Sequence, residues 1–261
     1  MKRRIDQLLV ERGLAESRHK AQALLIAGRV RVDGIMVDKP GHRVDAESEI
    51  QITDSLAYVS RGGLKLKGAL DHFQIDPSGR ICADLGASTG GFTDCLLQRG
   101  ARTVFAFDVG KGQLDWKLRN DPRVVVRDEF NVRNITAADL PQEISLITAD
   151  LSFISLAKIL PSLKSALVAR SLQMPGRPAD FFMDIILLVK PQFEVGKGQV
   201  GKGGIVRDAA KQKQAVESIE QFARDSGFQV AGSMPSPIAG ARGNKEFLLY
   251  LRLYPDLSSL P

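Results

Sequence analysis

Residues 82–93 read Cys-Ala-Asp-Leu-Gly-Ala-Ser-Thr-Gly-Gly-Phe-Thr, and this stretch decides the fold of most of the chain. It begins as an apolar, strand-like run, turns at glycines 86, 90 and 91, and leads into a helical pattern. Glycines in such a turn let the backbone approach a ligand closely and open a helix whose amides face that ligand. The stretch therefore predicts a strand, a ligand-binding turn and a helix in succession.

Beyond this stretch, strand-like and helix-like segments alternate, which is typical of a doubly wound parallel sheet. Helices are expected over Thr89–Gln98, Ile154–Val168 and Ala209–Ser226, and another begins near Gly62 and Gly63. The expected fold class is therefore an α/β, Rossmann-like domain with a seven-stranded, mostly parallel sheet. The expected strands are Arg80–Leu85, Thr103–Asp108, Val124–Arg127, Ser145–Asp150, Asp184–Lys190, Gln229–Ser233 and Glu246–Leu253.

An acid at the end of the second strand fits a nucleoside ligand. Asp108 follows Gly86 by 22 residues, and a carboxylate there can accept hydrogen bonds from both ribose hydroxyls. The dinucleotide pattern G-x-G-x-x-G is not met, because Ser88 stands where the second glycine would be. The other reading is a glycine-rich turn beside an ordinary exposed aspartate.

The order Asp-x-Gly-x-x-x-Gly-Gly, followed by that acid, is similar to the S-adenosylmethionine site of Rossmann-like methyltransferases. The resemblance implies S-adenosylmethionine as cofactor. Asp128 follows the third strand, where such enzymes meet adenine, and Asn131 is the alternative. The cofactor-binding residues implied are Asp84, Gly86, Ala87, Ser88, Gly90, Gly91, Asp108 and Asp128.

Four dispersed ionisable residues lie at predicted strand ends or at the domain junction: Lys65, Asp150, Lys190 and Glu246. Ligands of such sheets gather at the carboxyl ends of the parallel strands, so Asp150 and Lys190 are expected to meet there. The order Lys-Asp-Lys-Glu resembles the catalytic tetrad of FtsJ-like ribose 2′-O-methyltransferases. The alternative is a pair of ordinary salt bridges.

The implied chemistry gives each member of the tetrad a role. A ribose hydroxyl is a poor nucleophile, so the protein must align it and ease the loss of its proton. Lys190 is expected to be the base or the group that positions the hydroxyl, and Asp150 is expected to orient it. Lys65 and Glu246 are the flanking partners, and which lysine is neutral stays open.

The first 54 residues predict a small α+β domain with an excess of positive charge. Residues 1–43 hold ten lysines and arginines against five acids, which accounts for +5 of the chain's net charge of +6. Apolar spacing predicts a helix from Ile5 to Gly13 and another from Ser17, as its cap, to Gly28. The dipeptide Asp33-Gly34 predicts a tight hairpin, and residues 49–52 a further strand.

This order of elements resembles the S-four-type RNA-binding domain. The resemblance rests on residues 4–9, 17–21 and 26–34, and it implies that the second helix and the hairpin bind structured RNA. Lysines and arginines on one face can pair with phosphates without reading bases; the alternative is a solvated charged face. The RNA-binding residues implied are Arg4, Arg18, Lys20, Arg29 and Arg31.

Taken together, the whole chain resembles the TlyA family, often labelled hemolysin A. The phrases that carry the resemblance are residues 58–63, 150–156, 189–194 and 201–208. It implies 2′-O-methylation of ribosomal RNA, with ribosomal RNA or ribosomal subunits as partners. The implied division is an RNA-binding domain at 1–54, a linker at 55–62, a methyltransferase domain at 63–255 and a tail at 256–261.

Composition narrows the class of protein further. With 44% hydrophobic and 25% charged residues, the 261-residue chain has ordinary globular usage. The longest apolar run, residues 181–189, contains Asp184 and is too short to span a membrane, and no signal peptide is evident at the amino terminus. A cytoplasmic protein with reduced Cys82 and Cys95 is expected.

Several further features carry expectations of their own. His19, His42 and His72 are dispersed, so no metal site is expected. Residues 196–203 nearly match a phosphate-binding loop, but Gly203 replaces the required hydroxyl, which favours an RNA contact or a lid. Trp116 is expected in the core, and the long connection 169–180 at the surface, where it can touch RNA. The competing functions are a noncatalytic RNA-binding or ribosome assembly factor and, disfavoured, a membrane-lytic hemolysin.

Overall fold

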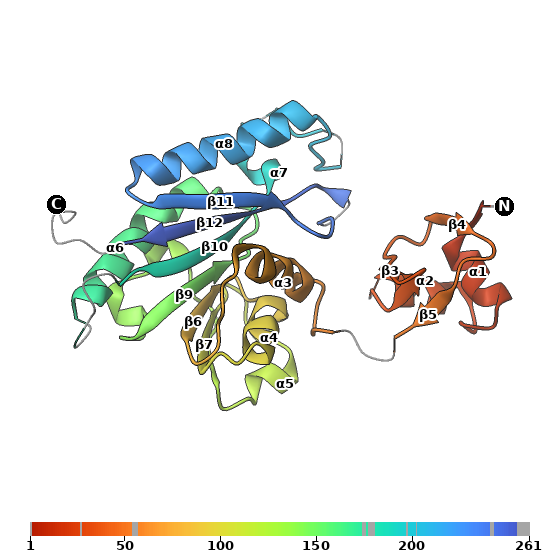
Figure 1. Cartoon of the computed structure of the whole chain (residues 1–261), viewed down its shortest axis with the longest axis horizontal. Helices are drawn as coiled ribbons and strands as arrows, with labels where there is room; N and C mark the ends of the chain where they lie inside the picture. Colours follow the sequence, from red (N-terminus) through yellow and green to blue (C-terminus); the bar gives the residue numbers. More distant parts are fainter. Residues whose placement is uncertain are drawn as a thin grey trace. The chain divides into compact units, whose positions relative to one another are not determined.

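The computed structural model describes residues 2–26, 28–53, 57–173, 176, 181–196, 198–201, 203–240 and 243–254. The chain forms two compact units, Met1–Arg61 and Gly62–Pro261, which are drawn in Figure 1. Each unit has its own hydrophobic core, as expected of chain segments that pack independently.

The amino-terminal unit packs two short helices against two small antiparallel sheets. The Asp33-Gly34 hairpin is confirmed: these residues have φ of 50° and 77° and join β2 to β3. The expected cap at Ser17 is also confirmed, since its Oγ accepts a hydrogen bond from the Lys20 amide at 3.2 Å. Strands β1 and β4, which pair with each other, were not expected from the sequence. The elements are β1 (Lys2–Arg4), α1 (Ile5–Glu11), α2 (Arg18–Ile26), β2 (Val30–Val32), β3 (Ile35–Met36), β4 (Arg43–Asp45) and β5 (Ile50–Ile52).

The second unit is built on one seven-stranded sheet in the order β11-β12-β10-β9-β6-β7-β8. All strands are parallel except β12, which runs antiparallel to both β10 and β11. The expected α/β fold with a mostly parallel sheet is confirmed. Its strands are β6 (Ile81–Leu85), β7 (Thr103–Phe107), β8 (Val124–Arg127), β9 (Ile144–Ala149), β10 (Met183–Val189), β11 (Gln229–Pro235) and β12 (Phe247–Leu253).

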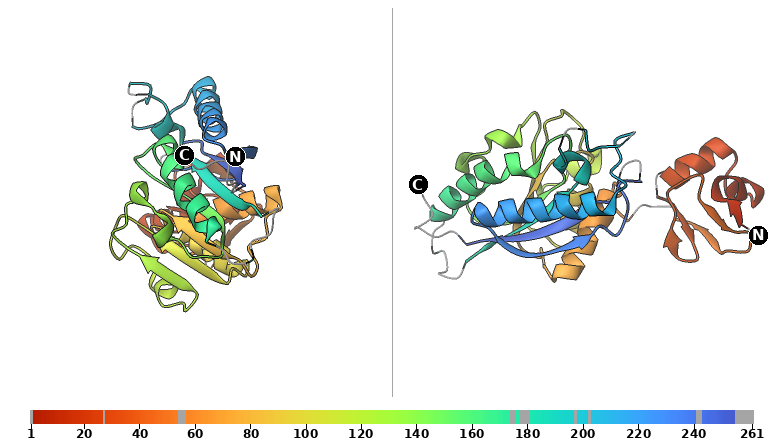
Figure 2. Two further views of the ribbon diagram at one scale, coloured as in Figure 1. Left: turned by 90° about the vertical axis from the view of Figure 1, so that its left-hand side faces the viewer. Right: turned by 90° about the horizontal axis from the view of Figure 1, so that it is seen from above.

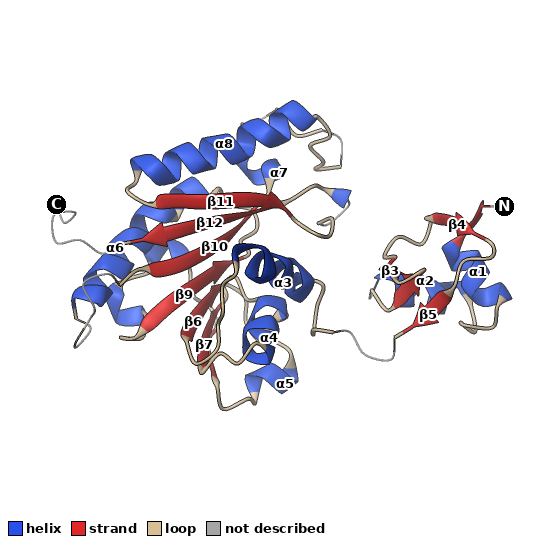
Figure 3. Ribbon diagram, viewed as in Figure 1, coloured by secondary structure: helices blue, strands red, loops and turns tan. Residues whose placement is uncertain are grey.

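Helices cover both faces of this sheet (Figures 1 and 3). Helices α6 and α8 pack on one face, where their apolar side chains join those of alternate strand residues such as Leu85 and Ile147 in one core cluster. Helices α3 and α4 lie together on the other face, and Figure 2 shows α8 running along the sheet near β11. The helices are α3 (Gly62–Phe73), α4 (Gly91–Gln98), α5 (Trp116–Arg119), α6 (Leu160–Leu172), α7 (Pro191–Glu194) and α8 (Ala209–Asp225), with 3₁₀ turns η1 (Val132–Asn134), η2 (Ala137–Asp139) and η3 (Leu156–Lys158).

Two expectations about this unit are wrong. The helix expected over residues 154–168 starts only at Leu160, because Ser155 caps a separate 3₁₀ turn, η3, and Pro161 opens α6. Trp116 is not in the core: it begins the short α5 and is 76% exposed. Parts of the surface connection 169–180, and the tail 256–261, lie outside the described residues.

Candidate active site

A cavity of about 570 Å³ opens at the carboxyl ends of β6, β7, β8 and β9. This is the edge of a parallel sheet at which ligands bind in doubly wound folds. Of the cofactor-binding residues implied by the sequence, Gly86, Ser88 and Asp108 line the cavity, together with Asp150 of the tetrad. The other lining residues are Val109, Gln113, Phe130, Asn131, Val132, Arg133, Leu151, Ser152, Phe153, Ile154 and Ile159.

The turn after β6 requires glycine at its first position. Gly86 has φ of +82°, and a Cβ added there would lie 2.7 Å from the backbone oxygen of Asp150. A side chain at this position would therefore be strained and would push the β9 loop away. Gly90 and Gly91 begin α4 and, with Ala87, support the turn without lining the cavity.

Asp108 directly follows β7, and its carboxylate accepts two backbone hydrogen bonds. Its Oδ2 accepts from the Ser88 amide at 2.8 Å, and its Oδ1 accepts from the Gly110 amide at 2.7 Å. A carboxylate oxygen has two lone-pair sites, so both oxygens can still accept from hydroxyl groups of a nucleoside. The spacious cavity, the open glycine turn and this carboxylate fit S-adenosylmethionine.

Asp84 lies beneath the turn, fully buried, and does not line the cavity. Thr93 Oγ1 donates to it at 2.7 Å, and Thr148 Oγ1 donates at 3.1 Å. Burial raises the pKa of Asp84 to about 7, although both hydroxyls oppose this shift. Its contacts join β6 to α4 and β9, so it supports the turn from below.

The two residues considered for the adenine position are placed differently relative to the cavity. Asp128 does not line the cavity: Arg119 Nη2 donates to its Oδ2 at 2.8 Å, and the Gly112 amide donates at 3.2 Å. Although burial opposes it, these partners hold the pKa of Asp128 below its usual range. Asn131, the alternative for this position, does line the cavity.

Lys190 and Asp150 meet at the rim of the cavity. Lys190 follows β10 directly, Asp150 follows β9, and Nζ lies 2.6 Å from Oδ1. Lys190 Nζ also donates to Ser152 Oγ at 2.7 Å, a contact that the sequence did not indicate. The lysine is 8% exposed, so its nitrogen is held in a defined place rather than moving freely in solvent.

Lys65 and Glu246 form the second pair. Nζ of Lys65, on α3, lies 2.6 Å from Oε2 of Glu246, and both side chains are buried. Glu246 directly precedes β12, whose Phe247 pairs with Val189 of β10. The residues after Val189 and before Phe247 are Lys190 and Glu246, so both pairs lie at the same edge of the sheet.

Two further residues near the site were missed in the sequence. Asn244 is buried: its Oδ1 accepts from the Val206 amide at 3.2 Å, and its Nδ2 donates to the Gly204 oxygen at 2.9 Å. It thus ties the described part of the glycine-rich loop to the start of β12. Phe153 is 89% exposed, has φ of +64°, and its ring centroid lies 5.3 Å from that of Phe193. No periodic signal marks either residue.

In the amino-terminal unit, two of the implied RNA-binding arginines are engaged by a buried acid. Asp6 Oδ2 accepts from Arg4 and from Arg18, each at 2.9 Å, and from Gln22 at 3.2 Å. The Arg4 hydrogen bond, followed by those of Arg18 and Gln22, holds the pKa of Asp6 well below its usual range against the opposing effect of burial. Both arginines remain partly exposed while paired with this acid.

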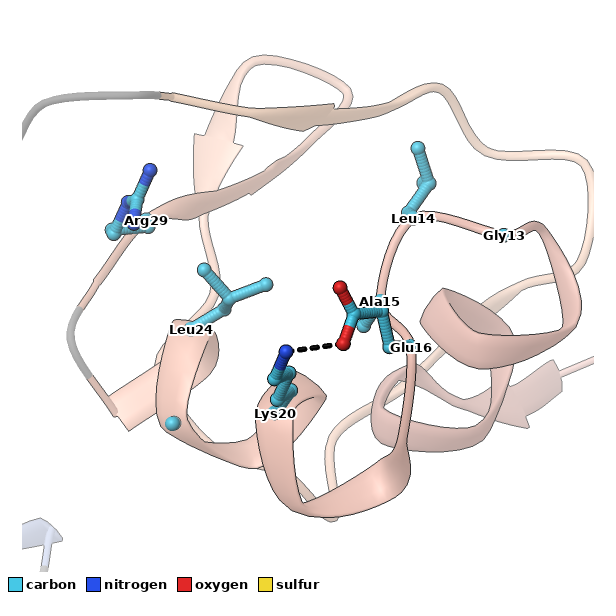
Figure 4. A pocket seen from close by; sticks show the side chains of 8 residues that line it. Gly13, Leu14, Ala15, Glu16, Lys20, Leu24 and Arg29 are labelled. Atoms are coloured by element: carbon cyan, nitrogen blue, oxygen red, sulfur yellow. Dashed lines mark hydrogen bonds and ion pairs between the residues drawn. The ribbon is translucent and has the colours of Figure 1, made fainter.

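Lys20 and Arg29 line a hollow of about 560 Å³ on the same unit (Figure 4). Leu14 and Leu24 are apolar lining residues, and Lys20 forms an ion pair with Glu16, which also lines the hollow. Arg29 Nε donates to the Thr53 oxygen at 2.9 Å. Arg31 does not line this hollow; its Nη1 donates to the Gly34 oxygen of the hairpin at 2.9 Å.

Two families of domains match the chain. Residues 58–253 match the FtsJ-like methyltransferases, and residues 3–50 match the S4 domain. Sheet, cavity and match together define a Rossmann-like methyltransferase that uses S-adenosylmethionine. More narrowly, the chain belongs to the TlyA family, the family that its sequence resembles, which carries an S4 domain before the FtsJ-like domain.

Individual relatives and a solved structure support this assignment. The 16S/23S rRNA (cytidine-2′-O)-methyltransferase TlyA of Mycobacterium tuberculosis is 49% identical over 97% of this chain and 91% of its own. Hemolysin A of Brachyspira hyodysenteriae is 41% identical over 95% of this chain and 98% of its own. A Streptococcus thermophilus structure that carries a hemolysin name has a TM-score of 0.70 and 42% identity, covering 96% of this chain and 88% of that one.

The hemolysin name raises the question of membrane insertion. Among the described residues, none of the helices combines the length and the apolar character needed to cross a bilayer.

Proposed function

We propose that this protein transfers a methyl group from S-adenosylmethionine to the 2′-hydroxyl of a ribose in ribosomal RNA. The observation that carries the proposal is the buried Lys190 amine, held by Asp150 and Ser152 beside the cofactor cavity. A methyltransferase that acts on a hydroxyl needs such a group at the point where the acceptor meets the methyl donor. The Mycobacterium tuberculosis relative is named for this reaction.

In the proposed reaction, S-adenosylmethionine supplies the electrophilic methyl group. Lys190 Nζ takes the proton of the 2′-hydroxyl or positions that hydroxyl by a hydrogen bond. Asp150 and Ser152 hold Nζ in place, since each contacts it within 2.7 Å. Glu246 balances the charge of Lys65 in the second buried pair, which lies at the same edge of the sheet. Such positioning accounts for much of the rate gain in a transfer between two bound reactants.

The cofactor is held by the turn after β6 and by the acid after β7. Gly86 and Ser88 bring the backbone to the cavity wall, and Asp108 accepts from the ribose hydroxyls of the cofactor. Asn131 takes the adenine position in this proposal in preference to Asp128. Asp84, Ala87, Gly90 and Gly91 support the turn rather than touch the cofactor.

We assign RNA recognition to the amino-terminal domain, residues 1–54, and catalysis to residues 63–255, with 55–62 as a linker. The supporting observation is that most of the net positive charge falls within the first 43 residues. Arg4, Arg18, Lys20, Arg29 and Arg31 are the proposed phosphate contacts. The partner is ribosomal RNA, free or in a subunit, and we place the reaction in the cytoplasm because ribosomal subunits are found there.

The test is transfer of tritiated methyl from S-adenosylmethionine to purified ribosomal RNA, to each subunit and to whole ribosomes that lack this modification. Incorporation at a ribose 2′-oxygen, located by mapping the modified nucleotide, is the expected result. Binding of RNA without incorporation would instead support a noncatalytic assembly factor. Leakage of liposomes at similar protein concentrations would support the membrane-lytic alternative.

A further inference from the structure

Glu194 is a partly buried carboxylate that the proposed chemistry does not use. It ends α7, four residues after Lys190. Its Oε2 accepts a hydrogen bond from Ser155 Oγ at 2.6 Å, and its Oε1 accepts from the Leu156 amide at 3.0 Å. Burial raises the pKa of Glu194, and these two donors oppose that shift.

The two partners of Glu194 end the loop that begins with Asp150. Ser155 is the cap of η3, and its Oγ also accepts from the Ala157 amide at 3.2 Å. The segment 150–156 is thus held at one end by Lys190, through Asp150 and Ser152, and at the other end by Glu194. Residues 190–194 therefore hold both ends of the loop.

The loop between these two attachments has a strained conformation. Phe153, in its middle, has φ of +64°, a region that a bulky side chain rarely adopts. Its ring packs against Phe193, the neighbour of Glu194. Such a conformation persists only when surrounding contacts fix it, and the Glu194 hydrogen bonds tie this end of the loop to α7.

We propose that Glu194 is a positioning residue: by fixing Ser155 and Leu156, it holds the 150–156 loop so that Asp150 and Ser152 place Lys190 for methyl transfer. The expected effect of Glu194 on methyl transfer rests on the proposed function, whereas its expected effect on the 150–156 loop does not. Glu194 does not line the cavity, and its hydrogen bonds run to Ser155 and Leu156 of the loop.

The test compares Glu194→Ala, Glu194→Gln and Ser155→Ala with a matched control, Asp139→Ala. Asp139 also accepts from a hydroxyl and a backbone amide at a 3₁₀ turn, both of Thr136, and it does not line the cavity. Glutamine keeps an oxygen for the Leu156 amide and offers an NH₂ group to Ser155 Oγ. It therefore separates the hydrogen bonds from the charge.

We expect Glu194→Ala to lower kcat by roughly 10- to 100-fold, because small displacements of reacting groups have effects of this size. The affinity for S-adenosylmethionine should stay within about twofold, and Glu194→Gln should recover most of kcat. Ser155→Ala removes one of the two contacts and should lower kcat by roughly 3- to 10-fold. If Glu194→Ala does not fold, Ser155→Ala serves as the test of the proposal. Equal losses in Asp139→Ala, or full kcat in Glu194→Ala, would overturn the proposal.

Hydrogen exchange on the full chain with S-adenosylmethionine separates this inference from the proposed function. Glu194→Ala should speed amide exchange in residues 150–158 and leave residues 86–98 unchanged, whereas Asp139→Ala should change neither segment. Unchanged exchange at 150–158 would overturn the positioning role even if RNA is methylated. Absence of methyl transfer by the unsubstituted protein, with the exchange difference present, would count against the proposed function alone.

Discussion

The Nζ atom of Lys190 lies 2.6 Å from Oδ1 of Asp150, and the two residues directly follow neighbouring parallel strands. The sheet therefore fixes this contact, since the backbones of β9 and β10 are paired up to Ala149 and Leu187. A lysine held in this way has a narrow range of positions, as a group that must meet a ribose hydroxyl requires.

Lys190→Ala should abolish methyl transfer and preserve cofactor binding. Loss of a positioned base or hydrogen-bonding group is expected to lower kcat by roughly 10³-fold. Lys190 does not line the cofactor cavity, so calorimetric binding of S-adenosylmethionine should be nearly unchanged. The control is Lys213→Ala, which removes a lysine paired with Glu217 on the exposed face of α8. Full turnover by Lys190→Ala would remove this residue from the mechanism.

The second pair allows catalytic and structural roles to be separated. Glu246→Leu leaves the buried Lys65 ammonium without its partner, so the free energy of unfolding should fall by about 3 kcal/mol. The double variant Lys65→Met with Glu246→Leu should recover much of this loss, because a buried pair can be replaced by apolar groups. Chemical denaturation and methyl transfer are measured on the same samples.

The decisive outcome is the activity of that double variant. If Lys65 and Glu246 take part in the reaction, the double variant should regain its stability but should not transfer the methyl group. A double variant that is both stable and active would show that Lys65 and Glu246 form an ordinary salt bridge.

The sequence predicted those parts of the site that follow from the order of strands in the sheet. Asp150 and Lys190 were expected to meet because each follows a parallel strand, and parallel strands share a carboxyl edge. Lys65 on α3 and Glu246 before the antiparallel β12 are 181 residues apart, and only the family resemblance indicated that pair. The hairpin at Asp33 was evident because its turn chemistry is local. Contacts that depend on loop conformation were not evident: Ser152, which contacts Lys190, lies in the loop after β9, where Phe153 has φ of +64°.

The expectation that Trp116 lies in the core was wrong. Trp116 was expected in the core because most tryptophans are largely buried, but α5 has only four residues and turns this side chain outward. Asp128 was expected at adenine because it follows the third strand, where the methyltransferases it resembles meet adenine, and this stays a prediction. Residue spacing does not reveal that Arg119, nine residues earlier, donates to its carboxylate.

Asp84 should make stability depend on pH between about 4 and 7. Its pKa is about 7 in the folded protein and near 3.8 when exposed, so the folded state keeps a proton that the unfolded chain releases over this interval. The contribution of Asp84 to stability is therefore full below pH 4 and is lost as pH rises through 7. A shift of this size corresponds to about 4 kcal/mol.

Asp84→Asn tests this dependence because asparagine cannot ionise there. The variant should be more stable relative to the unsubstituted protein at pH 8 than at pH 5, as measured by urea denaturation at both values. Groups that titrate equally in both proteins cancel in this difference. A difference that does not change with pH would mean that Asp84 stays ionised, or stays protonated, throughout the range.

In the amino-terminal unit, RNA contact and stability can be separated with two arginines. Arg31 Nη1 donates to the Gly34 oxygen of its own hairpin, whereas Arg18 pairs with the buried Asp6. Arg31→Ala should weaken RNA binding and lower the slope of log affinity against log salt by roughly one, with unfolding unchanged. Arg18→Ala should also destabilise the unit by about 1 kcal/mol, since half of its side chain is screened by solvent.

Binding titrations at several salt concentrations and hydrogen exchange across residues 2–26 measure these two effects. An Arg31→Ala variant with unchanged affinity and salt slope would exclude this side chain as a phosphate contact. If Arg18→Ala lowers affinity without faster exchange, its bond to Asp6 does not stabilise the unit. Because Asp6 also holds Arg4, the expected loss in Arg18→Ala is smaller than that in Asp6→Asn, which frees both arginines at once.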